Sequence, residues 1–274
     1  MNLNIRSVIL VASSALIITS CQKMDRPPLG DYPKDANAPG GPLKFYAAFD
    51  EKNVDSVRAN FGTFNDASIV DGGVSGKCVQ FDGSKNGFIN YPSANDFGQS
   101  TSFTISFWMN ITLAQKDNVN ADGVLAVASS TNFWSEVSIW VDHNTTKDTM
   151  DLKFHFANGT GDNWDFAGYA GANGLKGMYD GQWHHIAFTY DATSKTGTLY
   201  KDGAQFDQKT NETIAFDGNA SQLILGGFQE AVGLVSSYSD NSWMSGFPGK
   251  MDNVRLYGVA LSAADIKSIY DNKE

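Results

Sequence analysis

From Leu43 to the end of the chain, short runs of β-forming residues alternate with clusters of glycine, aspartate, asparagine and serine. In the run SFTISFWMNI, the odd positions from Phe103 to Met109 are apolar, and Thr104 and Ser106 lie between them. This period of two residues is typical of a strand that buries one face. Similar runs predict strands over residues 43–49, 77–82, 87–91, 102–111, 123–129, 136–142, 150–157, 183–190, 197–206, 221–227 and 250–258. We therefore expect an all-β fold, an antiparallel two-sheet jelly-roll sandwich.

Two local patterns predict how the chain turns and ends. In GTLYKDGAQF, the Asp-Gly pair at 202–203 predicts a type I′ hairpin between two alternating arms. Near the C-terminus, LSAADIKSIYDN predicts one short helix, with Ser262 as N-cap and Asp265 completing a capping box. Leu261 and Ile266 are spaced to pack together as a hydrophobic staple at the start of this helix.

The first 42 residues have a different composition. Residues 1–20 combine an early cation, Arg6, with an apolar run and a small polar end, which is typical of a secretory signal peptide. The end of this segment, ITSC, resembles a bacterial lipobox and implies lipidation of Cys21; an ordinary signal peptide with a chance cysteine is the alternative. Residues 21–42 are rich in proline, glycine and aspartate, which predicts a flexible tether before a domain over residues 43–274.

A lipid-modified cysteine would fasten the domain to a membrane without spanning it. The residues QKMD after the lipobox resemble the surface-export signal of Bacteroidetes lipoproteins, although their acidic part is thin. We therefore expect an anchored protein of the cell envelope at the outer membrane, and the export signal would place it on the surface. Lipidation of Cys21 would leave Cys78 without a disulfide partner, and its apolar surroundings predict a buried, inert thiol.

The formal net charge of −10 argues against nucleic-acid binding, which requires a basic patch. An acidic chain fits a neutral ligand, such as a sugar, or a cation. Aspartate far outnumbers glutamate, which together with abundant glycine and asparagine indicates many loops and few helices.

Five blocks of the chain occur in a characteristic order: FYAAFDEKNVDS, SGKCVQFDGSKNGFINYP, SFTISFWMNI, DGQWHHIAFTYDATSKTGTLYKDG and FPGKMDNVRLYGVALSAADIKSIYD. Together they resemble the laminin-G-like branch of the concanavalin A-like lectin/glucanase superfamily, from about Leu43 to Tyr270. The resemblance implies a jelly-roll sandwich with the tryptophan of SFTISFWMNI on the inner side. Such domains commonly bind carbohydrate and often hold a structural calcium ion. The fold alone does not establish the function.

No catalytic residues are predicted. Retaining glycosidases of this superfamily carry Glu-x-Asp-x-x-Glu, which places two carboxylates about 5 Å apart across the scissile bond. The chain has no such spacing, nor a zinc-protease, nucleophile-elbow or phosphate-loop motif. His184 and His185 are adjacent strand residues that point to opposite faces, so we expect structural hydrogen bonds rather than zinc binding.

Calcium is the metal that the family resemblance implies. In similar domains a calcium ion joins the turn after the first strand to the closing strand. The matching residues are Asp50 and Asp55 in FDEKNVDS and Asp252 in GKMDNVR. Calcium takes six to eight oxygen ligands, which aspartates and loop carbonyls can supply. Salt bridges with Lys250 and Arg255, or a turn role, are the alternative for Asp252.

Carbohydrate binding requires exposed aromatic rings and polar side chains that bond hydroxyl groups. Three tryptophans, Trp108, Trp140 and Trp183, fall within predicted strands, and we expect them in the core. Three others fall in polar, glycine-rich segments that we expect to be loops. The predicted sugar-binding residues are Trp134, Trp164, Tyr169 and Trp243, with polar contacts from Asp162, Asn163 and Asn241. Folding of these loops back over the sheet, as caps on the core, is the alternative.

The sequence thus predicts a non-catalytic, lipid-anchored lipoprotein that binds an oligo- or polysaccharide and works beside glycan-uptake proteins of the outer membrane. A structural or protein-interaction module of the cell surface is the alternative from another class. A glycoside hydrolase ranks third, because it would need two facing carboxylates that no motif displays.

Overall fold

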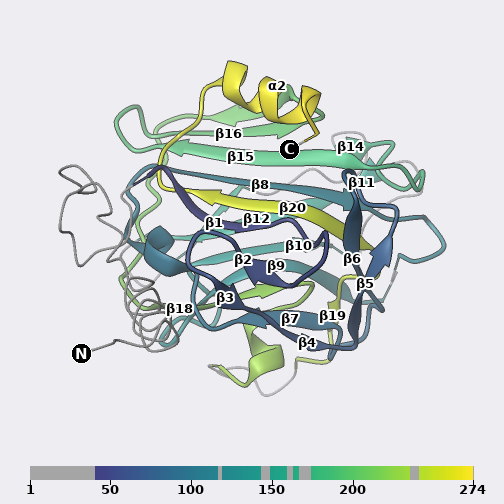
Figure 1. Cartoon of the computed structure of the whole chain (residues 1–274). Helices are drawn as coiled ribbons and strands as arrows, with labels where there is room; N and C mark the ends of the chain where they lie inside the picture. Colours follow the sequence, from purple (N-terminus) through teal and green to yellow (C-terminus); the bar gives the residue numbers. More distant parts are fainter. Residues whose placement is uncertain are drawn as a thin grey trace, which may run out of the picture. The chain divides into compact units, whose positions relative to one another are not determined.

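A computed structural model describes residues 41–116, 119–142, 149–158, 163–166, 174–234 and 241–273, with only the backbone described for 163–166. Contacts divide the chain into residues 1–40 and 41–274. Within the described ranges of the second unit, two large sheets lie face to face (Figure 1). No helix in these ranges is long and apolar enough to cross a membrane.

Each large sheet has eight strands among the described residues. Sheet 1 has the order β17 (Ala204–Lys209), β16 (Thr196–Lys201), β15 (His184–Asp191), β8 (Phe103–Asn110), β20 (Lys250–Tyr257), β6 (Lys77–Phe81) and β5 (Ala67–Asp71), with β1 (Leu43–Ala47) paired to β20. Sheet 2 has the order β13 (Asn163–Phe166), β12 (Leu152–Ala157), β10 (Val137–Val141), β9 (Ala121–Ser129), β18 (Ala220–Leu225), β7 (Phe88–Tyr91) and β4 (Thr63–Asn65), with β19 (Met244–Gly246) parallel to β9.

Smaller elements complete the fold. They are the strand pairs β2 (Val54–Asp55) with β3 (Asn60–Phe61) and β11 (Thr149–Met150) with β14 (Leu175–Lys176), the 3₁₀ helices η2 (Asn95–Gln99) and η4 (Gln229–Val232), and the helix α2 (Ala263–Asp271). Apart from β19 with β9, all strand pairs described in the two large sheets are antiparallel. The all-β sandwich with a C-terminal helix is therefore confirmed.

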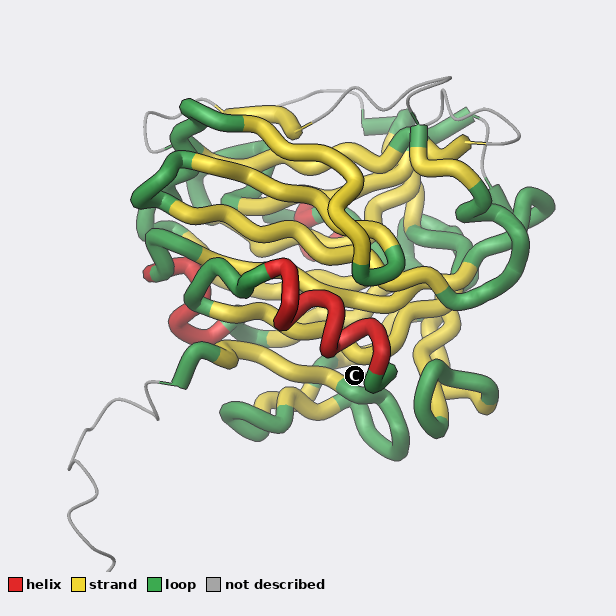
Figure 2. Tube along the Cα trace, turned by 90° about the horizontal axis from the view of Figure 1, so that it is seen from above, coloured by secondary structure: helices red, strands yellow, loops and turns green. Residues whose placement is uncertain are grey.

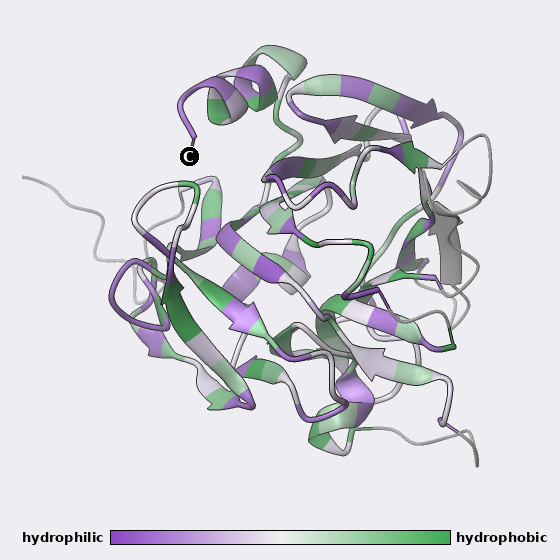
Figure 3. Cartoon of the chain, turned by 90° about the vertical axis from the view of Figure 1, so that its right-hand side faces the viewer, coloured by the Kyte–Doolittle hydropathy of each residue, from purple (hydrophilic) through white to green (hydrophobic). Residues whose placement is uncertain are grey.

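The main core lies between the sheets, because each strand turns its apolar residues of one parity inward. Phe103 and Phe107 of β8 belong to this core, and Phe103 meets Phe156 of β12 with ring centroids 5.6 Å apart. Phe156 in turn stacks on Phe188 of β15, at 4.7 Å. Apolar and polar segments alternate visibly along several strands (Figure 3). Burial of these rings supplies the main stabilisation of a fold in which the one described cysteine, Cys78, is free.

The predicted turn and helix cap are both present. Asp202 and Gly203 have φ of 51° and 75°, as a type I′ turn requires. In α2, the Ser262 side chain accepts a hydrogen bond from the Asp265 N–H, and the Ser262 N–H donates in turn to the Asp265 carboxylate. Viewed from above, the helix lies on the outer side of the strands (Figure 2). Ile266 packs there in a cluster separate from the main core.

Trp108 lies on the outer side of sheet 1, beneath α2, and not on the inner side that the family resemblance implies. Its ring is buried, but it stacks on Tyr270 of α2 at 5.6 Å rather than facing the space between the sheets. The neighbouring His185 shares a 2.8 Å hydrogen bond with Ser106, and burial lowers the pKa of this histidine to about 4. These contacts make the outer side of β8 and β15 a support for the helix.

His184 points away from His185, as the strand period predicts. Its Nδ1 lies 3.0 Å from Asp202 and its Nε2 3.2 Å from Asp180. The hydrogen bond with Asp202 raises the pKa of His184 above its ordinary value. The structural hydrogen bonds predicted for both histidines are present. Cys78 is also as predicted, since it is buried and burial raises the pKa of its thiol to about 11.

Candidate functional site

Three tryptophan rings gather on the outer face of sheet 2. Trp140 belongs to β10, where Ile139 and Val141 on either side of it face the main core, so Trp140 faces outward. Trp134 stacks on it, with centroids 5.8 Å apart and an interplanar angle of 18°. Trp243 lies 5.8 Å from Trp134 at 43°. We call Trp134, Trp140 and Trp243 the tryptophan cluster.

The rings of the cluster differ in exposure. Trp140 is buried, whereas Trp134 and Trp243 are only partly buried. Phe228 packs beside both Trp140 and Trp243, and His155 lies 5.0 Å from Trp134. The arrangement combines a buried aromatic base with two partly exposed indoles. Trp140 is thus a core residue, as expected, but its core cluster lies on the outer face of sheet 2, and two predicted sugar-binding residues, Trp134 and Trp243, come together beside it.

The loop that carries Trp134, residues 129–136, is fixed by one buried side chain. Gln229 of η4 is 2 % exposed. Its amide nitrogen donates to the carbonyl oxygens of Asn132, at 2.6 Å, and Phe133, at 2.8 Å, while its oxygen accepts the Ser129 N–H at 2.8 Å. All three bonds go to the backbone of this loop. The position of Trp134 is therefore set before any ligand arrives.

Polar groups border Trp243 in its own loop. The backbone oxygen of Asn241 accepts bonds from Lys85 Nζ, at 2.5 Å, and from the Met244 N–H, at 3.1 Å. The side-chain oxygen of Asn241 is buried and has no hydrogen-bond partner among the described residues. A buried amide oxygen without a partner favours a ligand group that donates a hydrogen bond. Asn241 thus lies two residues before Trp243, in the loop that carries this ring.

For two of the remaining predicted sugar-binding residues, Asn163 and Trp164, the structure describes the backbone. Asn163 and Trp164 were expected in a loop, but they belong to β13, where Trp164 is paired with Phe156. That correction concerns the backbone alone. Asp162 and Tyr169 lie outside the described residues. Trp183, expected in the core, is half-buried just before β15, and its indole N–H donates to Gly72 O at 3.1 Å.

The aspartates predicted for calcium separate into two places. Asp252 is fully buried, and its carboxylate accepts the N–H groups of Val74, at 2.7 Å, and Asn253, at 2.8 Å. Burial, with a smaller effect from Asp50, raises the pKa of Asp252 to about 7. Asp50 accepts the Lys77 N–H at 3.2 Å from the same loop, residues 72–77. Asp50 and Asp252 therefore approach one loop from two sides.

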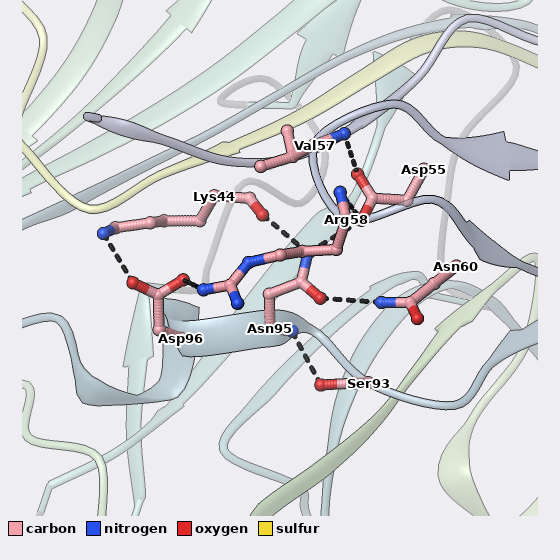
Figure 4. A network of polar contacts seen from close by, with 8 residues as sticks. All are labelled: Lys44, Asp55, Val57, Arg58, Asn60, Ser93, Asn95 and Asp96. Carbon is pink, nitrogen blue, oxygen red and sulfur yellow. Dashed lines mark hydrogen bonds and ion pairs between the residues drawn. The ribbon is translucent and has the colours of Figure 1, made fainter. Parts of the chain in front are cut away.

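Asp55 lies in a different network, shown in Figure 4. Its Oδ1 accepts the N–H groups of Tyr46, at 3.1 Å, and Val57, at 3.0 Å. Its Oδ2 accepts the Arg58 N–H, at 3.1 Å, and the Asn95 amide, at 2.8 Å. Because two carboxylate oxygens offer about four acceptor positions, these bonds occupy the group. Asp55 thus fixes a turn, and the calcium prediction stays with Asp50 and Asp252.

The described residues contain no group of three or more histidine, cysteine, aspartate or glutamate side chains that could hold a metal ion. One pair of carboxyl groups, those of Glu136 and Asp217, lies close together outside the loop 72–77. Glu136 is fully buried, accepts the Asp217 N–H at 3.0 Å, and shares a side-chain hydrogen bond with Asp217. Burial raises the pKa of Glu136 to about 8. These two carboxyl groups are hydrogen-bonded to each other, whereas the two carboxyl groups of a glycosidase lie about 5 Å or more apart, with the glycosidic bond between them.

Comparison with known proteins identifies a family and several solved structures of similar fold. Residues 82–267 match the laminin G family model described as "Concanavalin A-like lectin/glucanases superfamily". No curated protein matches the chain. Among solved structures, the binding domain of Paraclostridial Mosquitocidal Protein 1 is 17% identical with a TM-score of 0.60, over 84% of this chain and 52% of that one.

Two further structures share the fold. The receptor binding domain of botulinum neurotoxin type G is 12% identical with a TM-score of 0.59, over 87% of this chain and 52% of that one. The chain thus spans about half the length of these two toxin domains. Domain 4 of AbnA, a GH43 extracellular arabinanase from Geobacillus stearothermophilus in complex with arabinotriose, is 19% identical with a TM-score of 0.55, over 83% of this chain and 98% of that one. At these identities the likeness shows the fold alone.

Proposed function

The chain belongs to the laminin G family of the concanavalin A-like lectin/glucanases superfamily, and on that premise we propose that it is a non-catalytic carbohydrate-binding protein. The observation that carries this proposal is the tryptophan cluster. Trp134 and Trp243 are partly exposed on the outer face of a sheet, and the buried Trp140 supports them. A partly exposed indole offers the apolar face on which the C–H groups of a sugar ring stack.

Polar groups beside the rings complete the chemistry. The buried Asn241 side-chain oxygen can accept a hydroxyl proton, and the loop with Trp134 is already held in place by Gln229. Aromatic stacking with a few placed hydrogen bonds is the usual composition of a small-ligand site. The arabinotriose named for domain 4 of AbnA supports an oligosaccharide as the class of ligand, since that domain has this fold over nearly its whole length.

A binding experiment tests the proposal with matched variants. Trp134→Ala and Trp243→Ala are compared with Trp183→Ala, which removes a half-buried indole far along the sequence from the cluster. Affinity electrophoresis in gels containing arabinan, xylan, mannan or β-glucan identifies the polysaccharide, and calorimetry with its trisaccharide gives the affinity. Loss of a stacking contact worth about 0.5–1.5 kcal/mol weakens binding roughly 2- to 13-fold.

The expected result is weaker binding for both cluster variants and unchanged binding for Trp183→Ala. Equal binding by all three variants, with wild-type melting temperatures, would refute the cluster as the site. Absence of binding to every polysaccharide would instead favour the alternative class, a protein-interaction module of the cell surface.

Calcium remains a proposal for the loop 72–77. The two carboxylates reach this loop only because it contains glycine: a Cβ on Gly73 would lie 2.7 Å from Asp252 Oδ2, and a Cβ on Gly76 would lie 2.1 Å from Asp50 Oδ1. Carboxylates with loop carbonyls are a suitable donor set for calcium. We expect calcium to raise the melting temperature of the wild type and to leave Asp252→Asn unchanged. Identical calcium responses in both proteins would exclude this loop.

Anchoring is a proposal that rests on the sequence. Lipidation of Cys21 would place the domain at the cell envelope behind the tether 21–42, where captured glycan could pass to uptake proteins of the outer membrane. Incorporation of a labelled fatty acid by the wild type and its loss in Cys21→Ser would support the anchor. Equal labelling of both proteins would contradict it.

A further inference from the structure

A hollow in the described part of the chain shares no residue with the tryptophan cluster. Its volume is about 480 Å³, within the range of about 300–1,000 Å³ typical of small-molecule sites. One wall is formed by residues 98–101, which include the end of η2, and another wall by residues 213–218, which we call the strap. Tyr190 of β15 and Lys195 of the following turn also line it. No tryptophan contributes to the lining.

The strap is held at both ends by buried groups. Near its start, the Tyr190 hydroxyl donates to Glu212 O and accepts the Ile214 N–H, both at 3.1 Å. Near its end, the Asp217 N–H donates to the buried carboxyl group of Glu136 at 3.0 Å. Because these bonds fix the backbone, the hollow exists without a ligand, and binding would cost little ordering of the protein.

The lining has the composition of a sugar site. The partly buried Phe216 ring packs on Phe97, at 5.5 Å, and Phe103, at 5.2 Å, which fixes its orientation. Around it are four neutral polar side chains that make no hydrogen bond within the described ranges: Gln99, Ser100, Thr101 and Thr213. Such hydroxyl and amide groups both donate and accept hydrogen bonds, as sugar hydroxyls do.

The charged residues that line the hollow favour a neutral ligand over an acidic one. The hollow has one cation, Lys195, and one anion, Asp217, so their effects on a ligand oppose each other. Asp217 is already engaged, since its carboxylate accepts the Asn219 N–H at 2.9 Å and shares a bond with Glu136. A neutral ligand therefore fits better than a uronate or a phosphate.

We propose that this hollow is a second carbohydrate site, which takes one end residue of a neutral oligosaccharide against Phe216. The site is independent of the tryptophan cluster, because no lining residue belongs to the cluster. The two sites can therefore be tested separately.

The test uses the full chain labelled with nitrogen-15, titrated to millimolar concentration with arabinotriose, xylotriose, mannotriose and cellotriose. We expect at least one of them to shift the backbone amide signals of residues 98–101 and 213–218. Thr213→Val removes one hydroxyl group with little change in shape, and loss of one hydrogen bond weakens binding about 2- to 13-fold. Thr210→Val is the matched control, because Thr210 is exposed and outside the lining.

The outcomes separate this proposal from the proposed function. Shifts in the two walls that persist in Trp134→Ala and Trp243→Ala, and that need more ligand in Thr213→Val than in Thr210→Val, support the second site. Shifts confined to the tryptophan cluster would overturn the second site and leave the proposed function standing. Tighter binding of galacturonic acid trimers than of every neutral trisaccharide would overturn the assignment to neutral sugars.

Discussion

Glu136 makes the stability of the domain depend on pH in a direction unusual for a carboxyl group. It is fully buried, one of its oxygens accepts the Asp217 N–H, and the other has no partner among the described residues. Burial raises its pKa from 4.5 to about 8. The folded protein therefore holds a proton on Glu136 at pH values where the unfolded chain has lost it.

The sign follows from the number of protons bound in each state. Below about pH 4.5 both states are protonated, and Glu136 does not affect the balance. Between about pH 4.5 and 8 the folded state binds more protons, so the free energy of unfolding falls as pH rises. The slope is at most about 1.4 kcal/mol per pH unit for a single group. Over the whole window the loss is on the order of 5 kcal/mol.

Glu136→Gln imitates the protonated carboxyl group at every pH, because it has nearly the same shape and its oxygen can accept the Asp217 N–H without a negative charge. Urea unfolding monitored by tryptophan fluorescence, at a series of pH values from 4.5 to 8.5, measures both proteins. We expect similar stability near pH 4.5 and an increasing advantage of the variant toward pH 8. Other titrating groups, including Asp252 and His184, cancel in the difference between variant and wild type.

Parallel stability curves for the two proteins would refute this reasoning, since they would show that Glu136 titrates equally in the folded and unfolded states. A variant whose advantage shrinks as pH rises would refute the sign. Asp217→Asn is a useful second variant. It removes the negative partner that accepts the Glu136 proton, so it should lower the pKa of Glu136 and flatten the slope.

Three further predictions concern single side chains. Gln229→Ala removes three hydrogen bonds to the loop 129–136 and should lower the free energy of unfolding by about 2–4 kcal/mol in urea titrations, with the exposed Gln205→Ala as control; a change below that of the control would contradict it. Ser262→Ala removes the cap of α2 and should cost about 1 kcal/mol in the same assay. His185→Gln should flatten the fall in stability between about pH 6.5 and 4, because burial lowers the pKa of His185 and makes acid destabilising in the wild type.

Much of the fold could be predicted because its determinants are local. The alternation in residues 103–110 places Phe103 and Phe107 in the core, and the capping box at Ser262 begins α2 at the expected place. β13 was not predicted, since NWDF is short and polar and follows a glycine-rich stretch. Pairing with β12 supplies the strand character that the local sequence lacks.

The candidate site was predicted less completely, because it depends on contacts between distant segments. Trp134 and Trp243 were identified from their polar surroundings, and Trp140 was assigned to the core on its apolar neighbours. Its parity, opposite to Ile139 and Val141, was the available signal that it faces outward. Gln229 had no such signal, because its function is defined by backbone groups about 100 residues away.

The same loop links the two candidate sugar sites. Residues 129–136 carry Trp134 at the cluster, and their last residue, Glu136, holds the strap through Asp217. Thr131 of this loop also donates to the Asp217 carboxylate, at 3.4 Å. Gln229 fixes the loop from its other side. Because one rigid segment positions both surfaces, ionisation of Glu136 above about pH 8 should set its charge against the Asp217 carboxylate, loosen the strap first, and reach Trp134 only if the bonds from Gln229 also fail. We therefore expect the wild type at high pH to bind sugar weakly at the strap and normally at the tryptophan cluster. The Glu136→Gln variant should bind sugar normally at both sites.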